Sequence, residues 1–473
     1  MGRYLAVDLG ATSGRVTAGR LADGRLDVRE VHRFANRPVG APEGLHWDVE
    51  GLFEATLTGL AAGCEAGDAP DGIAVSTWGV DYGLVDPDGR LLEPPGHYRS
   101  ADRRARERVL DAVPAEVLFA RTGVLPQPIN TVFRLGETIS RLRPPEGSTA
   151  LLMPDLWTFW LAGERGAERT IAGTTGMLAV RTGDWDDVLL EPAGIDRRLL
   201  PAVVEPGERA GTLLPEHGAR LGVARDVPVV WAASHDTASA VTALPGEGHV
   251  AYVSCGTWSL AGIEHDTPVL DPGVMEAGFT NELGIGGRVR FQRNLTGLWL
   301  MEEALRQWRA RGERLTAADA VAAAEREGPG ASHIDVGDPE LISAADVLAW
   351  IAEACRRSGQ AVPRTPGQFT RCILHSLAIA HGETIAQCVE LTGRRVDLVH
   401  MVGGGSRNAL LCGLTAEACE RPVLAGPAEA TSIGNLLVQA LAAGELGSLE
   451  ELRHVVRRSE QVVRYEPEGS RVP

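Results

Sequence analysis

Short apolar runs that end in polar clusters set the pattern of this chain. The first run covers residues 4–7 and is followed at once by an acid, two glycines and two hydroxyls, within residues 8–15. An apolar segment resumes at residues 16–18. Short apolar runs bounded by turn residues are typical of buried strands. We therefore predict a β-hairpin over these residues, with the polar cluster at its tip.

The composition of this hairpin tip suits a polyanion. Gly10 and Gly14 allow close approach of the backbone and a positive φ, while Thr12 and Ser13 can donate hydroxyls beside turn N–H groups. Asp8 would repel a bare phosphate, but it suits Mg²⁺, which bridges phosphate oxygens and carboxylates. The alternative is a glycine-rich turn with a capping aspartate, and the motif by itself leaves both interpretations open.

The elements that follow indicate the fold class. Asp23-Gly24 marks a second hairpin, so three strands open the fold as a meander. Asp48 precedes an apolar pattern with helical spacing, and residues 73–76 form the next buried run. This order of strand, two hairpins, helix and strand differs from a doubly wound α/β opening. It predicts a ribonuclease-H-like lobe of the kind found in actin-type ATPases and sugar kinases.

A second apolar run, residues 228–233, ends in the polar cluster at residues 234–240. Side chains that follow a strand lie at the carboxyl edge of the sheet, where open α/β sheets bind ligands. Asp236 is an acid in this cluster and could act as general base for a hydroxyl nucleophile. The alternative is that Asp236 only begins and caps a helix.

Two further motifs lie in the second half. Residues 249–259 repeat the opening pattern in weaker form, as a strand, a glycine with hydroxyls and a strand. Residues 396–402 form an apolar run that ends in the glycine triplet 403–405. Bare backbone between a strand and a helix accommodates a flat or anionic group, although a tight turn is the alternative. Duplicated phosphate hairpins predict two lobes that clamp a nucleotide.

Composition narrows the class of protein further. The 473 residues carry a net charge of −17, which argues against non-specific binding to nucleic acid or anionic membranes. The sequence shows neither a signal peptide nor an apolar stretch of ~20 residues. The seven cysteines are scattered, without the paired spacing of zinc sites. We expect a reduced, cytoplasmic protein without a disulfide framework, and leave open whether it is a monomer or a homodimer.

Taken in order, these motifs resemble those of the FGGY carbohydrate kinases. The resemblance runs from about residue 4 to about residue 463 and rests on residues 8–15, 77–81, 234–240, 254–259 and 403–405. It implies an α/β fold with two ribonuclease-H-like lobes around a central cleft. Residues 1–243 would hold the sugar site, the phosphate hairpin and the catalytic aspartate, and residues 244–473 would bind the nucleotide.

The resemblance also implies a reaction and a set of site residues. Three stretches, at residues 235–240, 256–259 and 294–299, are similar to the members that phosphorylate L-rhamnulose at its 1-hydroxyl with MgATP. Asp236 would be the general base and Asp8 would help to place Mg²⁺. The ketose would contact Gly79, Asp81, His235, Asp236, Thr237 and Asn294. The nucleotide would contact Ala11, Thr12, Ser13, Gly14, Arg15, Thr257, Glu302 and Gly404.

The sequence departs from the family pattern at one position and leaves two alternative functions open. Glu302 stands where a close relative would have glutamine near the nucleotide. The substrate could instead be another ketose, such as xylulose, ribulose or fuculose. The chain could also be a non-catalytic actin-like ATPase or sugar sensor, although an acid at Asp236 favours a working kinase. A regulator that reads DNA would need a basic helix-turn-helix segment, and the sequence shows none.

Overall fold

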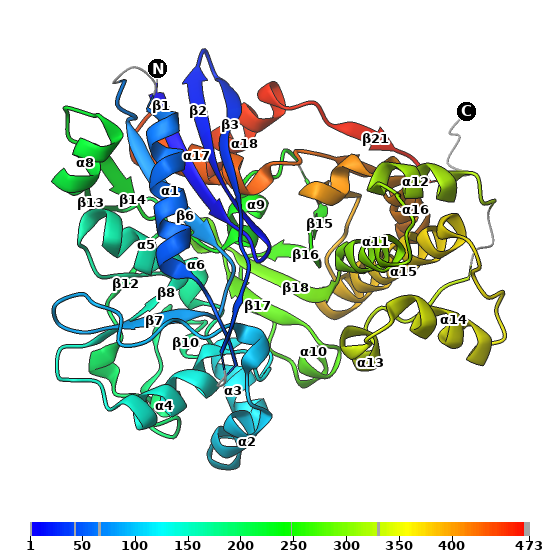
Figure 1. Ribbon diagram of the computed structural model, residues 1–473, viewed down its shortest axis with the longest axis horizontal. Helices are drawn as coiled ribbons and strands as arrows, with labels where there is room; N and C mark the ends of the chain where they lie inside the picture. Colours follow the sequence, from blue (N-terminus) through cyan, green and yellow to red (C-terminus); the bar gives the residue numbers. More distant parts are fainter. Residues whose placement is uncertain (1, 42–43, 65–67, 247, 329–331, 468–473) are drawn as a thin grey trace. The chain divides into compact units, whose positions relative to one another are not determined.

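Runs of strands and runs of helices follow one another along the chain, which the computed structural model describes over residues 2–41, 44–64, 68–246, 248–328 and 332–467 (Figure 1). The described residues form two compact units. The first unit combines residues 1–245, 265–291 and 430–459, and the second combines 246–264, 292–429 and 460–473. The chain therefore passes between the units repeatedly. The assignment of sugar and nucleotide binding to residues 1–243 and 244–473 stays a prediction.

The sheet of the first unit carries the predicted meander. Its strands run in the order β13-β14-β6-β1-β2-β3. Their bounds are β1 Gly2–Leu9, β2 Ser13–Ala22, β3 Arg25–Ala35, β6 Gly72–Thr77, β13 Arg209–Thr212 and β14 Pro228–Val230. Strands β1, β2 and β3 pair antiparallel, while β6 is parallel to both β1 and β14. The meander and the following parallel strand confirm the predicted ribonuclease-H-like opening.

Helices cover this sheet and bury its apolar side chains. Helix α1 (Val49–Gly63) begins after Asp48, whose carboxylate accepts the N–H of Gly51, so the predicted cap is confirmed. Leu5 and Val7 of β1 belong to one core cluster with side chains of α1 and α5 (Met153–Ala162). Helix α17 (Ala430–Ala442) also packs against this sheet, where it contacts β1, β2 and β6. A helix from near the end of the chain thus completes the first unit.

The first hairpin is as predicted, but its glycines act differently. Asp8 pairs with Arg15 and Leu9 with Gly14 across the ladder. Neither Gly10 nor Gly14 has a positive φ, so that part of the prediction is wrong. A Cβ on Gly14 would collide with the ring of Phe34 and approach Leu9 Cδ2 to 2.8 Å. Gly14 therefore leaves room for the Phe34 side chain of β3, which packs closely against the hairpin tip.

The second unit contains the second predicted hairpin. Strands β16, β15, β19, β20 and β21 lie in this order. Their bounds are β15 Val250–Cys255, β16 Trp258–His265, β19 Leu398–Val402, β20 Val423–Ala425 and β21 Val463–Tyr465. Strands β15 and β16 form an antiparallel hairpin, and β15 is parallel to β19. The predicted repeat of a strand, a polar turn and a strand is confirmed.

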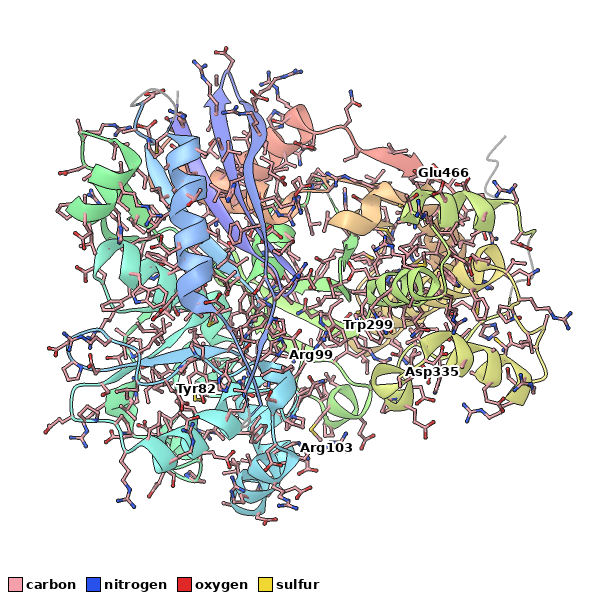
Figure 2. All side chains as sticks on the ribbon, in the orientation of Figure 1. Tyr82, Arg99, Arg103, Trp299, Asp335 and Glu466 are labelled. Atoms are coloured by element: carbon pink, nitrogen blue, oxygen red, sulfur yellow. The ribbon has the colours of Figure 1, made fainter. Side chains whose placement is uncertain are left out.

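Helices of the second unit pack against one another and against this sheet. The 27-residue helix α15 (Pro366–Thr392) lies along α16 (Ala409–Cys419) and α12 (Ala317–Glu325). The glycine triplet after β19 leads into a 3₁₀ turn, Gly404–Arg407, before α16 begins. Helix α11 (Trp299–Ala310) begins at Trp299, which is labelled in Figure 2.

Candidate active site

Three parallel strands of the first unit end side by side. The N–H of Thr77, at the end of β6, donates to the carbonyl of Ser234 at 2.8 Å. The N–H of Trp78 donates to the carbonyl of Leu9 at 3.3 Å. These bonds continue the ladders beyond β6, so the ends of β1, β6 and β14 meet at one carboxyl edge. The edge carries the polar clusters that the sequence places after each of these strands.

Asp236 stands at this edge as the first residue of the short helix α9 (Asp236–Thr242). The residue in the N-cap position is His235, and its side chain makes no capping bond. Oδ1 of Asp236 accepts the N–H of Thr237 and, at 3.0 Å, its hydroxyl. The side chain is 31% exposed. Since the described contacts all use Oδ1, Oδ2 is the oxygen that can accept a proton from a bound hydroxyl.

A buried glutamate that the sequence analysis missed holds the loop before Asp236. Glu168 is fully buried, and its carboxylate accepts the N–H of Ser234 at 3.0 Å. It also accepts the N–H and the hydroxyl of Thr170, at 2.9 and 2.6 Å. The Thr170 hydroxyl in turn accepts the N–H of His235 at 3.1 Å. Burial raises the pKa of Glu168 to about 7. Nothing in the local sequence of Glu168 signals the contact with Ser234, because Ser234 lies more than sixty positions away.

The turn at Gly79, Val80 and Asp81 holds a conformation that is rare for a branched side chain. Val80 has a φ of 67°, and the N–H of Asp81 donates to the carbonyl of Gly79 at 2.9 Å. This is the pattern of a γ-turn with positive φ, which is strained. Two hydroxyls hold it: Thr174 accepts the N–H of Val80 at 3.2 Å, and Thr131 donates to its carbonyl at 2.8 Å.

Asp81 itself is buried and engaged by four donors. Oδ2 accepts the indole N–H groups of Trp47 at 2.7 Å and Trp78 at 3.0 Å, and the backbone N–H of Tyr98 at 3.3 Å. Oδ1 is ion-paired with Arg134. We conclude that Asp81 fixes the shape of the turn. Its contact with a ketose stays a prediction.

Asp8 and the hairpin tip are braced from inside the first unit. Asp8 lies in β1, is 5% exposed, and has Oδ2 3.1 Å from Nε of Arg15. Asn36 donates its backbone N–H to the carbonyl of Thr12 at 3.0 Å and its side-chain amide to the carbonyl of Gly10 at 2.8 Å. Ala11, Thr12 and Ser13 remain partly or fully exposed. The tip is thus held by hydrogen bonds and accessible, as a phosphate site requires.

The donor set around Asp8 is compatible with Mg²⁺ delivered on a nucleotide. Among the described residues, no group of three or more His, Cys, Asp or Glu side chains could hold a metal ion by itself. Mg²⁺ at phosphate sites commonly has only one or two carboxylates, with phosphate oxygens and water as its other ligands. A single carboxylate at the end of β1 therefore fits a metal that arrives with the phosphates.

The second unit brings three predicted nucleotide residues close together. Register pairs Ser254 of β15 with Val402 of β19, so the turn at Thr257 and the glycine triplet follow neighbouring strand ends. The N–H of Trp299 donates to the carbonyl of Thr257 at 3.2 Å, which places the start of α11 on this turn. Glu302 lies in the first turn of α11, and burial raises its pKa. A Cβ on Gly404 would meet nothing within 4 Å, so its backbone is open to a ligand.

Two residues just before α11, Gly297 and Asn294, also bear on the proposed ligand contacts. Gly297 permits the contact between α11 and the hairpin, because a Cβ there would come within 2.5 Å of the Trp258 carbonyl carbon and 2.7 Å of the Gly256 oxygen. Asn294 is exposed on β18 (Val289–Thr296), before the helix begins. Its contact with sugar stays a prediction, as do the roles of the nucleotide residues.

All seven cysteines are free and buried in the structure. No helix among the described residues is both long and apolar enough to cross a membrane.

Comparisons with known proteins identify the family. The N-terminal domain of the FGGY family of carbohydrate kinases matches residues 3–243, and its C-terminal domain matches residues 251–443. The chain is 36% identical to a rhamnulokinase of Bacteroides thetaiotaomicron, over 98% of this chain and 96% of the relative. It is 37% identical to a rhamnulokinase of Enterococcus faecalis, over 96% of this chain and 92% of the relative.

Solved structures share the fold at lower identity. The xylulose kinase of Rhodospirillum rubrum aligns with a TM-score of 0.77 at 19% identity, over 99% of this chain and 95% of that one. The gluconate kinase of Lactobacillus acidophilus aligns with a TM-score of 0.79 at 16% identity, over 98% and 94%. These alignments confirm the two-domain α/β sugar-kinase fold. The matched domains and the relatives at 36% and 37% identity show that the chain belongs to the FGGY family of carbohydrate kinases.

Proposed function

We propose that this kinase transfers the γ-phosphoryl group of ATP to the 1-hydroxyl of L-rhamnulose, giving L-rhamnulose 1-phosphate and ADP. The choice of sugar is supported by the relatives named rhamnulokinase, which match at 36% and 37% identity over nearly the whole chain. The chemistry is supported by one observation: the carboxylate of Asp236 is anchored through Oδ1 and partly exposed at a carboxyl edge of the sheet.

In this proposal Asp236 is the general base. Oδ2 accepts the proton of the sugar 1-hydroxyl as its oxygen attacks the γ-phosphorus. The bond between that phosphorus and the β–γ bridging oxygen breaks, and ADP leaves. Such transfer depends mainly on positioning and on stabilisation of charge. The bonds from Thr237 fix the carboxylate, so it need not reorganise during the reaction.

Ligand contacts follow the predicted assignments. The ketose is oriented by Gly79, Asp81, His235, Thr237 and Asn294. The phosphates are held by Ala11, Thr12, Ser13, Gly14 and Arg15, and the rest of the nucleotide by Thr257, Glu302 and Gly404. Asp8 holds Mg²⁺, which supplies positive charge for the phosphoryl oxygens when it is bound.

The test is a panel of ketoses with MgATP, read by ADP release and by phosphorus NMR of the product. We expect L-rhamnulose to give the highest kcat/KM and a phosphate on carbon 1. Higher kcat/KM with xylulose, ribulose or fuculose would assign a different ketose. Failure to phosphorylate any of them would remove the proposal.

A further inference from the structure

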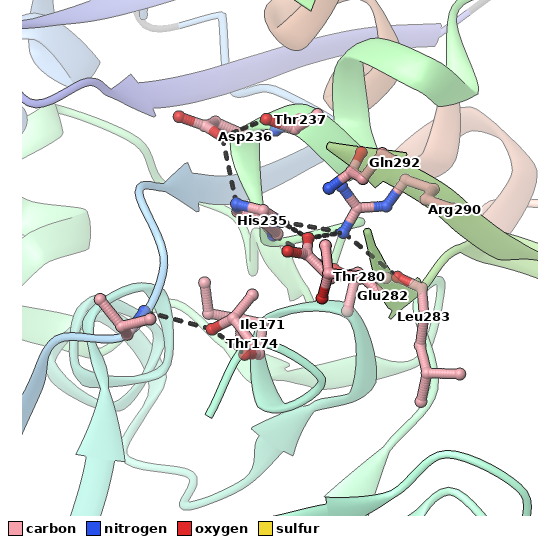
Figure 3. A network of polar contacts seen from close by, with 12 residues as sticks. Ile171, Thr174, His235, Asp236, Thr237, Thr280, Glu282, Leu283, Arg290 and Gln292 are labelled. Atoms are coloured by element: carbon pink, nitrogen blue, oxygen red, sulfur yellow. Dashed lines mark hydrogen bonds and ion pairs between the residues drawn. The ribbon is translucent and has the colours of Figure 1, made fainter. Parts of the chain in front are cut away.

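A buried cation contacts His235, the neighbour of the candidate base, from a part of the chain that the sequence analysis did not connect to it. Arg290 lies on β18, at 0% exposure, and Glu282 lies on β17 (Thr280–Leu283). Nη2 of Arg290 is 2.9 Å from Nδ1 of His235 and 3.0 Å from Oε2 of Glu282. On the other side of the ring, Nε2 of His235 is 3.4 Å from Oδ1 of Asp236. Figure 3 shows this chain of contacts from Arg290 through the imidazole to Asp236.

The contact with Arg290 determines where the imidazole carries its proton. A guanidinium only donates hydrogen bonds and does not lose its charge in proteins. Nδ1 of His235, at 2.9 Å from Nη2, must therefore accept and be unprotonated. In a neutral imidazole the single proton then lies on Nε2, the nitrogen that faces Asp236.

Glu282 by itself would favour the opposite tautomer of His235, with the proton on Nδ1. Its Oε2 is 3.4 Å from Nδ1 of His235, and a carboxylate favours a proton on the nitrogen it faces. Arg290 is closer to Nδ1 and is paired with the same carboxylate oxygen. The guanidinium therefore both occupies the Nδ1 lone pair and neutralises the acid that would protonate it. The charged groups facing the ring are thus Arg290, Glu282 and Asp236.

We propose that Arg290 is a positioning residue that holds His235 as the neutral tautomer with its proton on Nε2. The Nε2–H group then points to Oδ1 of Asp236 and leaves Oδ2 for the substrate proton. An imidazolium at the same place would add a positive charge beside the base and weaken it. The role of Asp236 in this argument rests on the proposed function, whereas the tautomer of His235 does not.

The test is NMR of the protein labelled with ¹⁵N-histidine, without substrate, because ¹⁵N shifts distinguish the two tautomers and the imidazolium. His235→Gln identifies the relevant signals among the twelve histidines. We expect an unprotonated Nδ1 and a protonated Nε2 at pH 7.5 in the wild type. A proton on Nδ1 in the wild type would overturn the proposal.

Variants then separate positioning from mere packing. Arg290→Met should move His235 toward the Nδ1–H or imidazolium form and lower kcat about 10- to 100-fold, the range known for partners that orient metal-bound histidines. Arg290→Lys keeps a donor and should restore the Nε2–H form with part of the activity. Glu282→Gln should leave the tautomer unchanged, because the guanidinium stays. Arg288→Met, which removes an exposed ion pair with Asp266, is the matched control and should change neither the tautomer of His235 nor kcat.

The outcomes are distinguishable from failure of the proposed function. If Arg290→Met does not fold, Arg290→Lys and Glu282→Gln still make the prediction, and a changed tautomer in either overturns it. If Arg290→Met and Arg290→Lys lose kcat equally and the tautomer of His235 does not change, Arg290 contributes only to packing. If the wild type has the Nε2–H form but phosphorylates no ketose, the proposed function fails and this inference stands.

Discussion

The backbone N–H of Ser234 donates a hydrogen bond to the carboxylate of Glu168, at 3.0 Å from Oε2. Because Ser234 lies two positions before Asp236, the buried Glu168 carboxylate fixes the backbone that carries the candidate base. The same carboxylate accepts the hydroxyl of Thr170, which in turn accepts the N–H of His235. The fold thus fixes the base through its backbone, from a residue more than sixty positions earlier in the chain.

The first prediction concerns the pH dependence that Glu168 imparts to stability. Its pKa rises from 4.5 to about 7 on folding, so the folded state binds the proton more tightly. The free energy of unfolding should therefore fall as pH rises from about 4.5 to about 7, on the order of 3 kcal/mol from this group. Glu168→Gln should lose this component of the slope. Denaturation at several pH values measures it.

The control for this prediction is Glu164→Gln, which changes an exposed glutamate of the same segment. It should keep the wild-type slope. An unchanged slope in Glu168→Gln would mean that the buried acid does not titrate in this range.

The second prediction concerns Asp236. Asparagine keeps the shape of the side chain but cannot take a proton. Asp236→Asn should lower kcat by about 10² to 10⁴ while the affinity for ketose and ATP stays near normal. The Oδ1 atom of asparagine can still accept the N–H and the hydroxyl of Thr237, so the melting temperature should barely change. Near-normal turnover in a folded variant would leave Asp236 with a structural role only.

A matched control exists at the opposite end of the same strand. Asp226 is exposed, shortly before β14 begins. Asp226→Asn should retain wild-type kcat, which separates the site from a general effect of removing an acid.

The third prediction concerns Asp8. Because Asp8 is buried beside Arg15, asparagine is a milder change there than alanine. If Asp8 holds Mg²⁺, Asp8→Asn should lower kcat and raise the Mg²⁺ concentration needed for half-maximal rate. Steady-state rates across a Mg²⁺ titration measure kcat and the half-maximal Mg²⁺ concentration. Asp27→Asn, at an exposed position of β3, is the control. A normal Mg²⁺ response in the variant would remove Asp8 from the mechanism.

The fourth prediction concerns the strained turn at Val80. Thr174→Val removes the hydroxyl that accepts the N–H of Val80. The turn should loosen, and KM for the ketose should rise about five- to tenfold, as expected for loss of one hydrogen bond, while KM for ATP stays constant. Thr158→Val, which removes a buried bond from a hydroxyl to its own helix, controls for stability. Equal changes in both variants would show that the turn does not act on the sugar site.

The fifth prediction concerns Glu302. The side chain is exposed, and its helix begins on the turn at Thr257, where we propose that the nucleotide binds. If the carboxylate accepts a hydrogen bond from the nucleotide, Glu302→Ala should raise KM for ATP about two- to tenfold, the scale of one hydrogen bond. Glu303→Ala, which breaks an ion pair with Arg306, should not raise it. An unchanged KM for ATP in Glu302→Ala would remove Glu302 from the nucleotide site.

The sequence by itself determined the local elements and their polar ends. The opening meander, the capped helix after Asp48 and the hairpin of β15 and β16 follow from the spacing of apolar positions and from turn residues, which act over a few positions. The motifs at residues 8–15 and 234–240 follow from the same rule, because residues after a parallel strand must lie at the carboxyl edge. Their order along the chain also resembled the family that the comparisons confirm.

Only the tertiary structure decided which distant residues support those motifs. Glu168 reaches Ser234, Arg290 reaches His235, and α17 joins the first unit from residues 430–442, although each is far from its partner in sequence. The sequence analysis also allowed a positive φ at Gly14, whereas the structure has no positive φ there and a Cβ would collide with the ring of Phe34. Such contacts depend on packing between segments, and local patterns of polarity carry no record of them.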